Sequence, residues 1–100
     1  LYECRRENTD AAFGPPQVRQ VAIVSGSGVS FAPEAQALGA DTFLTGETSH
    51  TDFYAAQDLG INLIYAGHYA TETVGLQALA RHLAARFPVQ TVWLDHPTGL

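Results

Sequence analysis

His68 and Glu72 are the residues whose types and spacing point most directly to chemistry. They lie four positions apart in the sequence Gly-His-Tyr-Ala-Thr-Glu of residues 67–72. If a helix begins near Tyr69, both side chains lie on one face of its first turn. There an imidazole nitrogen and a carboxylate oxygen can bind the same divalent metal ion. A structural alternative is that His68 or Thr71 caps the helix and Glu72 interacts with its positive end.

Glu47 and His50 form a second pair in the sequence Thr-Gly-Glu-Thr-Ser-His of residues 45–50. Glu47 could be a metal ligand, a general base or a helix-cap acceptor. His50 could be a ligand, an acid/base group or a donor to a ligand. Capping of the next helix by Thr48 or Ser49 would explain the same loop without any chemistry. We take Glu47 and His50 as candidate catalytic residues, with His68 and Glu72 as candidate metal ligands.

A glycine-rich stretch, Ser-Gly-Ser-Gly, occupies residues 25–28. Its backbone N–H groups could hold an anion ahead of a helix. The stretch lacks the Gly-Lys-Ser/Thr of a phosphate-binding P-loop, and Phe31 stands where a dinucleotide-binding motif has its last glycine. A tight turn between a strand and a helix is the favoured interpretation. His82 and His96 are interpreted as surface or packing residues.

The surrounding sequence predicts the elements that position these loops. Short apolar runs bounded by glycine indicate strands, and apolar residues at helical spacing indicate helices. The expected elements are strand 20–25, helix 31–38 with Ser30 as its N-cap, strand 41–45, helix 49–59, strand 61–66, helix 71–87 and strand 90–94. This βαβαβαβ order predicts an α/β fold with a mostly parallel sheet flanked by helices.

The helix expected over residues 71–87 is amphipathic. Its apolar residues fall largely on one face: Val74, Leu76, Leu79, Ala80, Leu83 and Phe87. Ahead of the first strand, the consecutive Pro15 and Pro16 forbid helix and indicate an extended segment. Residues 1–17 are therefore expected to be an irregular leader or linker, and residues 18–100 to form the α/β segment.

The three polar loops each follow a predicted strand. Ligands of parallel α/β sheets bind beyond the carboxyl ends of the strands, so residues 25–28, 45–50 and 67–72 should converge on one edge. This convergence is the main functional indication that the residues carry by themselves.

Composition narrows the classes of function. The net charge of −5 argues against nucleic-acid binding, which favours clustered Lys and Arg. The single cysteine, Cys4, excludes a disulfide within the chain and favours a reducing compartment such as the cytoplasm. No apolar run approaches the roughly 20 residues that a membrane helix needs.

The motifs resemble, in order and approximate spacing, the C-terminal segment of one family. These are the dinuclear-metal-centre proteins known as GTP cyclohydrolase I type 2 homologues, the Nif3-like family. The stretches that carry the resemblance are Val-Ala-Ile-Val-Ser-Gly-Ser-Gly, Gly-Ala-Asp-Thr-Phe-Leu-Thr-Gly-Glu, Gly-His-Tyr-Ala-Thr-Glu and His-Pro-Thr-Gly-Leu, all within residues 18–100.

The resemblance implies an α/β protein that assembles as a hexameric ring and holds two divalent metal ions in each complete site (Zn, Mn or Fe). It implies that His68 and Glu72 are metal ligands and that Glu47 and His50 lie beside the metals. The family's other ligands, a His-His pair and an Asp, come from an N-terminal half that has no match here. We therefore expect this sequence to be part of a longer chain and to bind metal weakly alone.

The leading functional hypothesis from the resemblance is a metal-dependent hydrolase of a nucleotide or phosphoester, since two ions can activate water and hold a phosphoryl group. His50 would orient water or substrate, or transfer a proton. A second hypothesis is a non-catalytic, metal-binding assembly or regulatory protein. A third is a structural domain whose His and Glu residues only cap helices.

Overall fold

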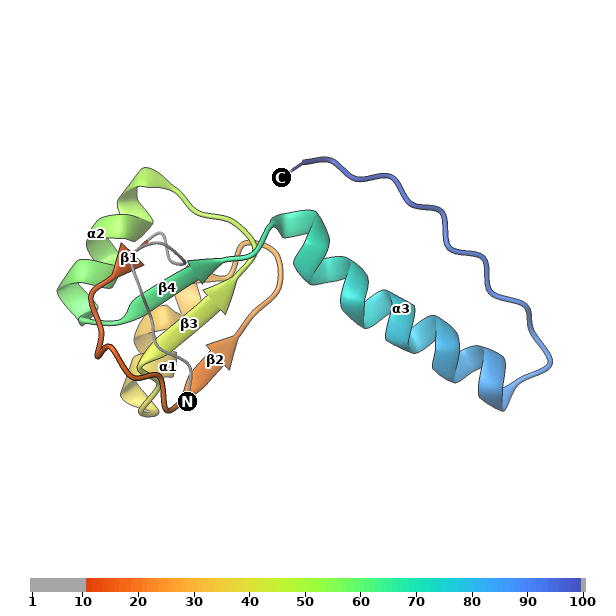
Figure 1. The fold of residues 1–100 in the computed structure, drawn as a ribbon, viewed down its shortest axis with the longest axis horizontal. Coiled ribbons are helices and arrows are strands. Elements are labelled where there is room, and N and C mark those ends of the chain that lie inside the picture. Colours follow the sequence, from red (N-terminus) through yellow and green to blue (C-terminus); the bar gives the residue numbers. More distant parts are fainter. Residues whose placement is uncertain (1–10, 100) are drawn as a thin grey trace.

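A four-stranded sheet in the order β1-β4-β3-β2 forms the centre of the computed structural model, which describes residues 11–99. β2 (Val21–Ile23), β3 (Thr42–Thr45) and β4 (Asn62–Tyr65) are parallel, and Phe43 of β3 pairs with Ala22 and Leu63. β1 (Ala11–Ala12) pairs antiparallel with β4 at one edge. The predicted α/β class with a mostly parallel sheet is confirmed (Figure 1).

Two helices pack against the sheet. A 3-10 turn, η1 (Val29–Phe31), leads into α1 (Ala32–Ala37), and α2 (His50–Leu59) follows β3. Buried alanines of these helices share one core cluster with Phe43, Ile61 and Leu63, which are fully buried. Burial of these side chains is the main stabilising contribution to the fold.

The helix boundaries show which local signals were sufficient. α2 begins at a capping box in which the Asp52 carboxylate accepts the Ser49 N–H at 2.7 Å, and it ends at Gly60 in the left-handed conformation. The prediction of Ser30 as the N-cap of α1 is wrong. Ser30 lies inside η1, and Phe31 precedes α1 without a side-chain cap, because the 3-10 turn itself supplies the entry.

α3 (His68–Arg86) begins three residues earlier than expected and projects away from the sheet (Figure 1). None of its residues is buried. The apolar residues of the predicted amphipathic face are exposed, as Val74, Leu76, Leu79, Leu83 and Phe87 show. The period of the apolar pattern therefore predicted the helix, but not the surface on which it packs.

The strand predicted over residues 90–94 is wrong. Residues 88–99 form no strand and turn back beside α3 toward its first turn (Figure 1). Tyr69 holds this segment there, because its hydroxyl donates to Asp95 at 2.7 Å and accepts the His96 N–H at 2.9 Å. A strand needs a neighbouring edge to pair with, and α3 carries this segment away from the sheet.

Part of the expected leader is joined to the sheet. Asn62, which is 1% exposed, accepts the Gly14 N–H at 2.9 Å and donates to the Pro15 carbonyl at 2.9 Å. Together with the pairing of β1, these bonds attach residues 11–15 to β4. Cys4 lies outside the described residues. Over residues 11–99, no helix is both long and apolar enough to cross a membrane.

Candidate metal-binding site

The three polar loops meet at the carboxyl ends of β2, β3 and β4. The Gly26 carbonyl accepts the N–H groups of Gly46 at 2.8 Å and Glu47 at 3.1 Å. It also accepts the buried Thr45 hydroxyl at 3.0 Å. On the other side, the Gly26 N–H donates to the Thr71 hydroxyl of α3 at 3.1 Å. The convergence expected from the strand order is confirmed, with Gly26 at its centre.

The stretch of residues 25–28 is a tight turn in which the N–H groups of both glycines are already engaged. The Gly26 N–H bonds to Thr71 and the Gly28 N–H bonds to Thr45 at 3.0 Å. Gly26 has a φ of +65°, a conformation that side chains with a Cβ rarely adopt. The interpretation as a tight turn is therefore supported over an anion cradle, which would need those N–H groups free.

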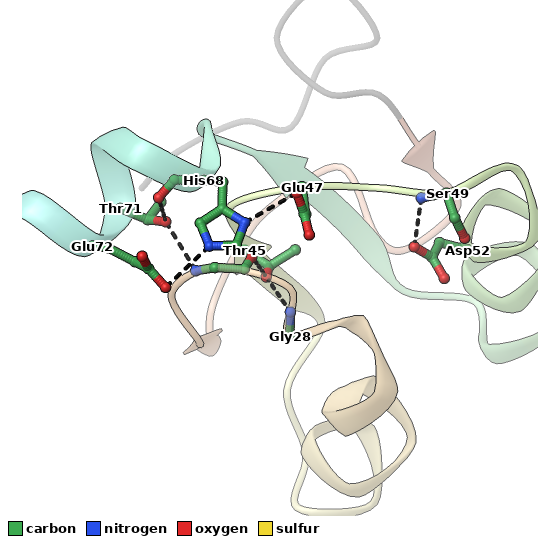
Figure 2. A network of polar contacts seen from close by, with 9 residues as sticks. Gly28, Thr45, Glu47, Ser49, Asp52, His68, Thr71 and Glu72 are labelled. Atoms are coloured by element: carbon green, nitrogen blue, oxygen red, sulfur yellow. Dashed lines mark hydrogen bonds and ion pairs between the residues drawn. The ribbon is translucent and has the colours of Figure 1, made fainter. Parts of the chain in front are cut away.

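His68 lies between two carboxylates. Its Nδ1 is 3.0 Å from Glu47 Oε2, and its Nε2 is 3.1 Å from Glu72 Oε1 (Figure 2). The side chains are partly exposed, at 35% for His68, 40% for Glu47 and 53% for Glu72, so the ion pairs add little to stability. Their geometry suits holding the imidazole in one orientation.

Electrostatics in this cluster follow from the same contacts. The hydrogen bond with Glu47 raises the pKa of His68; partial burial opposes the rise, and the negative charge of Glu72 adds to it. The hydrogen bond with His68 lowers the pKa of Glu47, and a Ser27 hydrogen bond contributes. Glu47 therefore stays ionised and is a strong acceptor for an imidazole N–H.

The structure does not show the alternative in which His68 or Thr71 caps the helix after residue 67. Gly67 precedes α3, and His68 is its first residue. The Thr71 hydroxyl donates to the His68 carbonyl at 3.0 Å while accepting the Gly26 N–H. Thr71 thus joins α3 to the turn of residues 25–28. The imidazole of His68 makes no capping bond and contacts Glu47 and Glu72.

His50 is placed differently from the other three candidates. As the first residue of α2, it packs edge-on against Tyr54, with ring centroids 5.4 Å apart. Capping of α2 through Ser49 accounts for this end of the loop. The contacts of the described residues join Glu47, but not His50, to His68.

The donor set around His68 fits part of a metal site. Nε2 of His68 and Oε1 of Glu72 approach one another beside Gly26, where a Cβ would lie 2.7 Å from Oε1 and 3.2 Å from Nε2. A mixed imidazole and carboxylate pair suits Zn, Mn or Fe. Within residues 11–99, no three side chains of His, Cys, Asp or Glu are grouped to hold one ion. Glu47 cannot complete such a set because it lies on the opposite nitrogen of the imidazole.

Sequence reasoning missed the roles of two threonines that build this site. Thr45 and Thr71 join the glycine turn to β3 and α3. The sequence does contain a hint of each role. Thr45 is a hydroxyl residue at a strand end next to a glycine, and Thr71 is a hydroxyl residue in the first turn of a helix. The tether between Tyr69 and Asp95 was also missed, since 26 residues separate the two side chains.

The sequence matches one protein family and several of its curated members. The family model described as Duf34/NIF3 (NGG1p interacting factor 3) matches residues 5–97. A protein of Pyrococcus abyssi named GTP cyclohydrolase 1 type 2 homolog is 48% identical over 88 residues, which are 88% of this chain and 35% of that protein. A Deinococcus radiodurans protein of the same name is 44% identical over 87 residues, 87% of this chain and 33% of that protein.

Solved structures of other proteins have a fold similar to that of this chain. The crystal structure of TTHA1606 from Thermus thermophilus matches with a TM-score of 0.80 and 50% identity, covering 89% of this chain and 36% of that one. Reduced HcgD from Methanocaldococcus jannaschii matches with a TM-score of 0.61 and 31% identity, covering 70% of this chain and 29% of that one. The chain thus spans about a third of the length of its curated relatives.

Proposed function

Because this chain belongs to the Duf34/NIF3 family, we propose that it supplies His68 and Glu72 as ligands to a divalent metal site in a nucleotide or phosphoester hydrolase. The observation that carries the proposal is the pairing of His68 Nε2 with Glu72 Oε1 at 3.1 Å on the first turn of α3. Two donors that close can share an ion at the usual bond lengths of about 2.0–2.2 Å.

The roles of the chain's own residues follow from their positions. His68 and Glu72 bind metal from one helical turn, and Glu47 contacts the imidazole from the neighbouring loop. A divalent ion bound there would supply Lewis-acid activation of water or of a phosphoryl oxygen. The bond between Gly26 and Thr71 fixes the first turn of α3 at the sheet edge, which keeps the ligand pair at the strand ends.

The complete site needs more donors than this pair. We propose two divalent ions, Zn, Mn or Fe, with the other ligands supplied by segments of the relatives' length that this chain does not span. We also propose that the complete natural polypeptide is a cytoplasmic homo-oligomer with a ring of six subunits. The number of subunits can be measured by light scattering.

Metal analysis tests the ligand assignment. In the complete natural polypeptide, His68→Ala and Glu72→Ala should each lower the bound metal per chain, measured by mass spectrometry of the metal. His82→Ala is the matched control, because His82 is an exposed histidine of the same helix. If both ligand variants keep the metal content of the unmodified protein, the assignment is wrong.

Activity measurements test the hydrolase. Nucleotides and phosphoesters are offered to the complete protein loaded with Zn, Mn or Fe. Metal-dependent turnover of at least one, lost in His68→Ala, supports the proposal. No turnover on any of them favours the second candidate, a non-catalytic metal-binding assembly or regulatory protein. The position of His50 against Tyr54 favours that candidate, since the expected proton-transfer residue does not contact the ligand pair.

A further inference from the structure

His68 can bind metal through only one of its two ring nitrogens while the other carries a proton. A neutral imidazole has one N–H donor and one lone pair, and its surroundings decide which nitrogen has which. In this site both nitrogens face a carboxylate, Glu47 at Nδ1 and Glu72 at Nε2. The two carboxylates are held in different ways, and this difference distinguishes their roles.

Glu47 comes from the loop after β3, and a backbone hydrogen bond holds it in place. Its N–H donates to the Gly26 carbonyl at 3.1 Å, beside the bond from Gly46 to the same oxygen. Glu47 is thus attached to the turn after β2 while its Oε2 contacts Nδ1 at 3.0 Å.

Glu72 lies on the same helix as His68 and faces Nε2 beside Gly26. The absence of a side chain at Gly26 leaves space there, since a Cβ would lie 3.2 Å from Nε2. If Nδ1 carries the proton toward Glu47, the Nε2 lone pair and the Glu72 oxygen face each other at 3.1 Å. Two electron-rich atoms repel at this separation unless a proton or a metal ion lies between them, and a metal ion bound here takes the place of that proton.

We propose that Glu47 is a positioning residue that accepts the Nδ1–H of His68, so that Nε2 and Glu72 converge on the metal ion. This inference rests on the proposed metal site, and it gives Glu47 a role outside the set of ligands. Carboxylates that accept the second N–H of a metal-bound histidine fix its orientation and tautomer, and their removal typically lowers metal affinity by about 10–100-fold.

Zinc titration of the complete natural polypeptide, in competition with a chromophoric chelator, measures the effect. Glu47→Ala should weaken Zn²⁺ binding by about 10–100-fold. Glu47→Gln should recover part of the loss, because its amide oxygen can still accept the Nδ1–H. Glu34→Gln is the matched control, because Glu34 is an exposed residue of α1 on a different element. It should bind as the unmodified protein does.

Nitrogen-15 NMR of the His68 ring, with Zn²⁺ bound, separates positioning from a general loss of structure. The unmodified protein should show a protonated Nδ1 and a metal-bound Nε2. Glu47→Ala should shift the ring toward a mixture of states while its melting temperature stays close to that of the unmodified protein. Unchanged affinity and an unchanged ring spectrum in Glu47→Ala would overturn the inference.

The two proposals fail in different ways. Loss of metal in His68→Ala and Glu72→Ala, with none in Glu47→Ala, overturns only the role of Glu47. Retention of metal in the His68 and Glu72 variants overturns the metal site itself. A protonated Nε2 with metal on Nδ1 in the unmodified protein overturns the role of Glu47, since its carboxylate then lies on the metal side.

Discussion

Gly26 lies directly against Glu72: a Cβ atom added to Gly26 would lie 2.7 Å from Glu72 Oε1. Gly26→Ala should therefore push Glu72 away from His68 and lower metal binding. The φ of +65° adds backbone strain, so the variant should also lose about 1–3 kcal/mol of unfolding free energy. Chemical denaturation and the metal content per chain measure the two effects.

Gly75→Ala is the control for this variant. Gly75 lies inside α3, and a Cβ there meets nothing within 4 Å. Alanine should stabilise the helix by up to about 1 kcal/mol and leave metal binding unchanged. If the two alanine variants behave alike, the close approach of Gly26 to Glu72 does not matter for the site.

Asn62 should be important for stability although it is polar. Asn62→Ala removes the acceptor for the Gly14 N–H and the donor to the Pro15 carbonyl. Because these groups are partly buried, the cost should be about 1–3 kcal/mol. Gly14 should also lose protection from hydrogen exchange. Gln57→Ala, at an exposed position of α2, should change neither measurement.

Asp41 should make stability depend on pH. Partial burial raises the pKa of its carboxyl, but hydrogen bonds from the Arg19 N–H, the Thr42 hydroxyl and the Gln20 N–H outweigh this, so the pKa lies below its ordinary value. A lowered folded pKa means that the ionised form stabilises the fold above the unfolded pKa. That stabilisation is lost as pH falls through the folded value.

Asp41→Asn should therefore be less stable than the unmodified protein at neutral pH. The difference should shrink as pH falls below about 4. Urea denaturation at a series of pH values measures it, with Asp58→Asn on the exposed side of α2 as the control for removing one charge. A difference that grows toward low pH would contradict the assigned hydrogen bonds.

Two leucines should respond very differently to truncation. Leu63 is fully buried between the sheet and the helices, so Leu63→Ala should cost about 2–5 kcal/mol. Leu79 of α3 is 51% exposed, so Leu79→Ala should cost this segment under about 1 kcal/mol. Denaturation of the 100-residue chain measures both values. A large loss at Leu79 would mean that α3 packs against the sheet in solution.

Much of the site could be read from local patterns. The spacing of His68 and Glu72 predicted one helical face, and the strand order predicted convergence of the three loops. His50 could not be placed in this way, because its orientation depends on where α2 begins and on its packing against Tyr54. The position of Glu47 on Nδ1 likewise depends on a contact between distant segments.

The sequence by itself determined the strands β2, β3 and β4, the helices, and the parallel direction of these three strands. Apolar periodicity and glycine punctuation are local properties that act over a few residues. Only the tertiary structure decided that α3 leaves the sheet, that residues 90–94 form no strand, and that residues 11–12 do. Each of these depends on whether a neighbouring surface is present to pack against or pair with.

The same division applies to His68 and Glu72. Their identity and spacing made them candidates for one metal ion, because residues four apart share a helical face. Only the fold brought Glu47 to the second ring nitrogen and Gly26 beside Glu72, from loops far apart in sequence. Three-dimensional contacts set the orientation of an imidazole, and orientation decides which nitrogen is available to a metal.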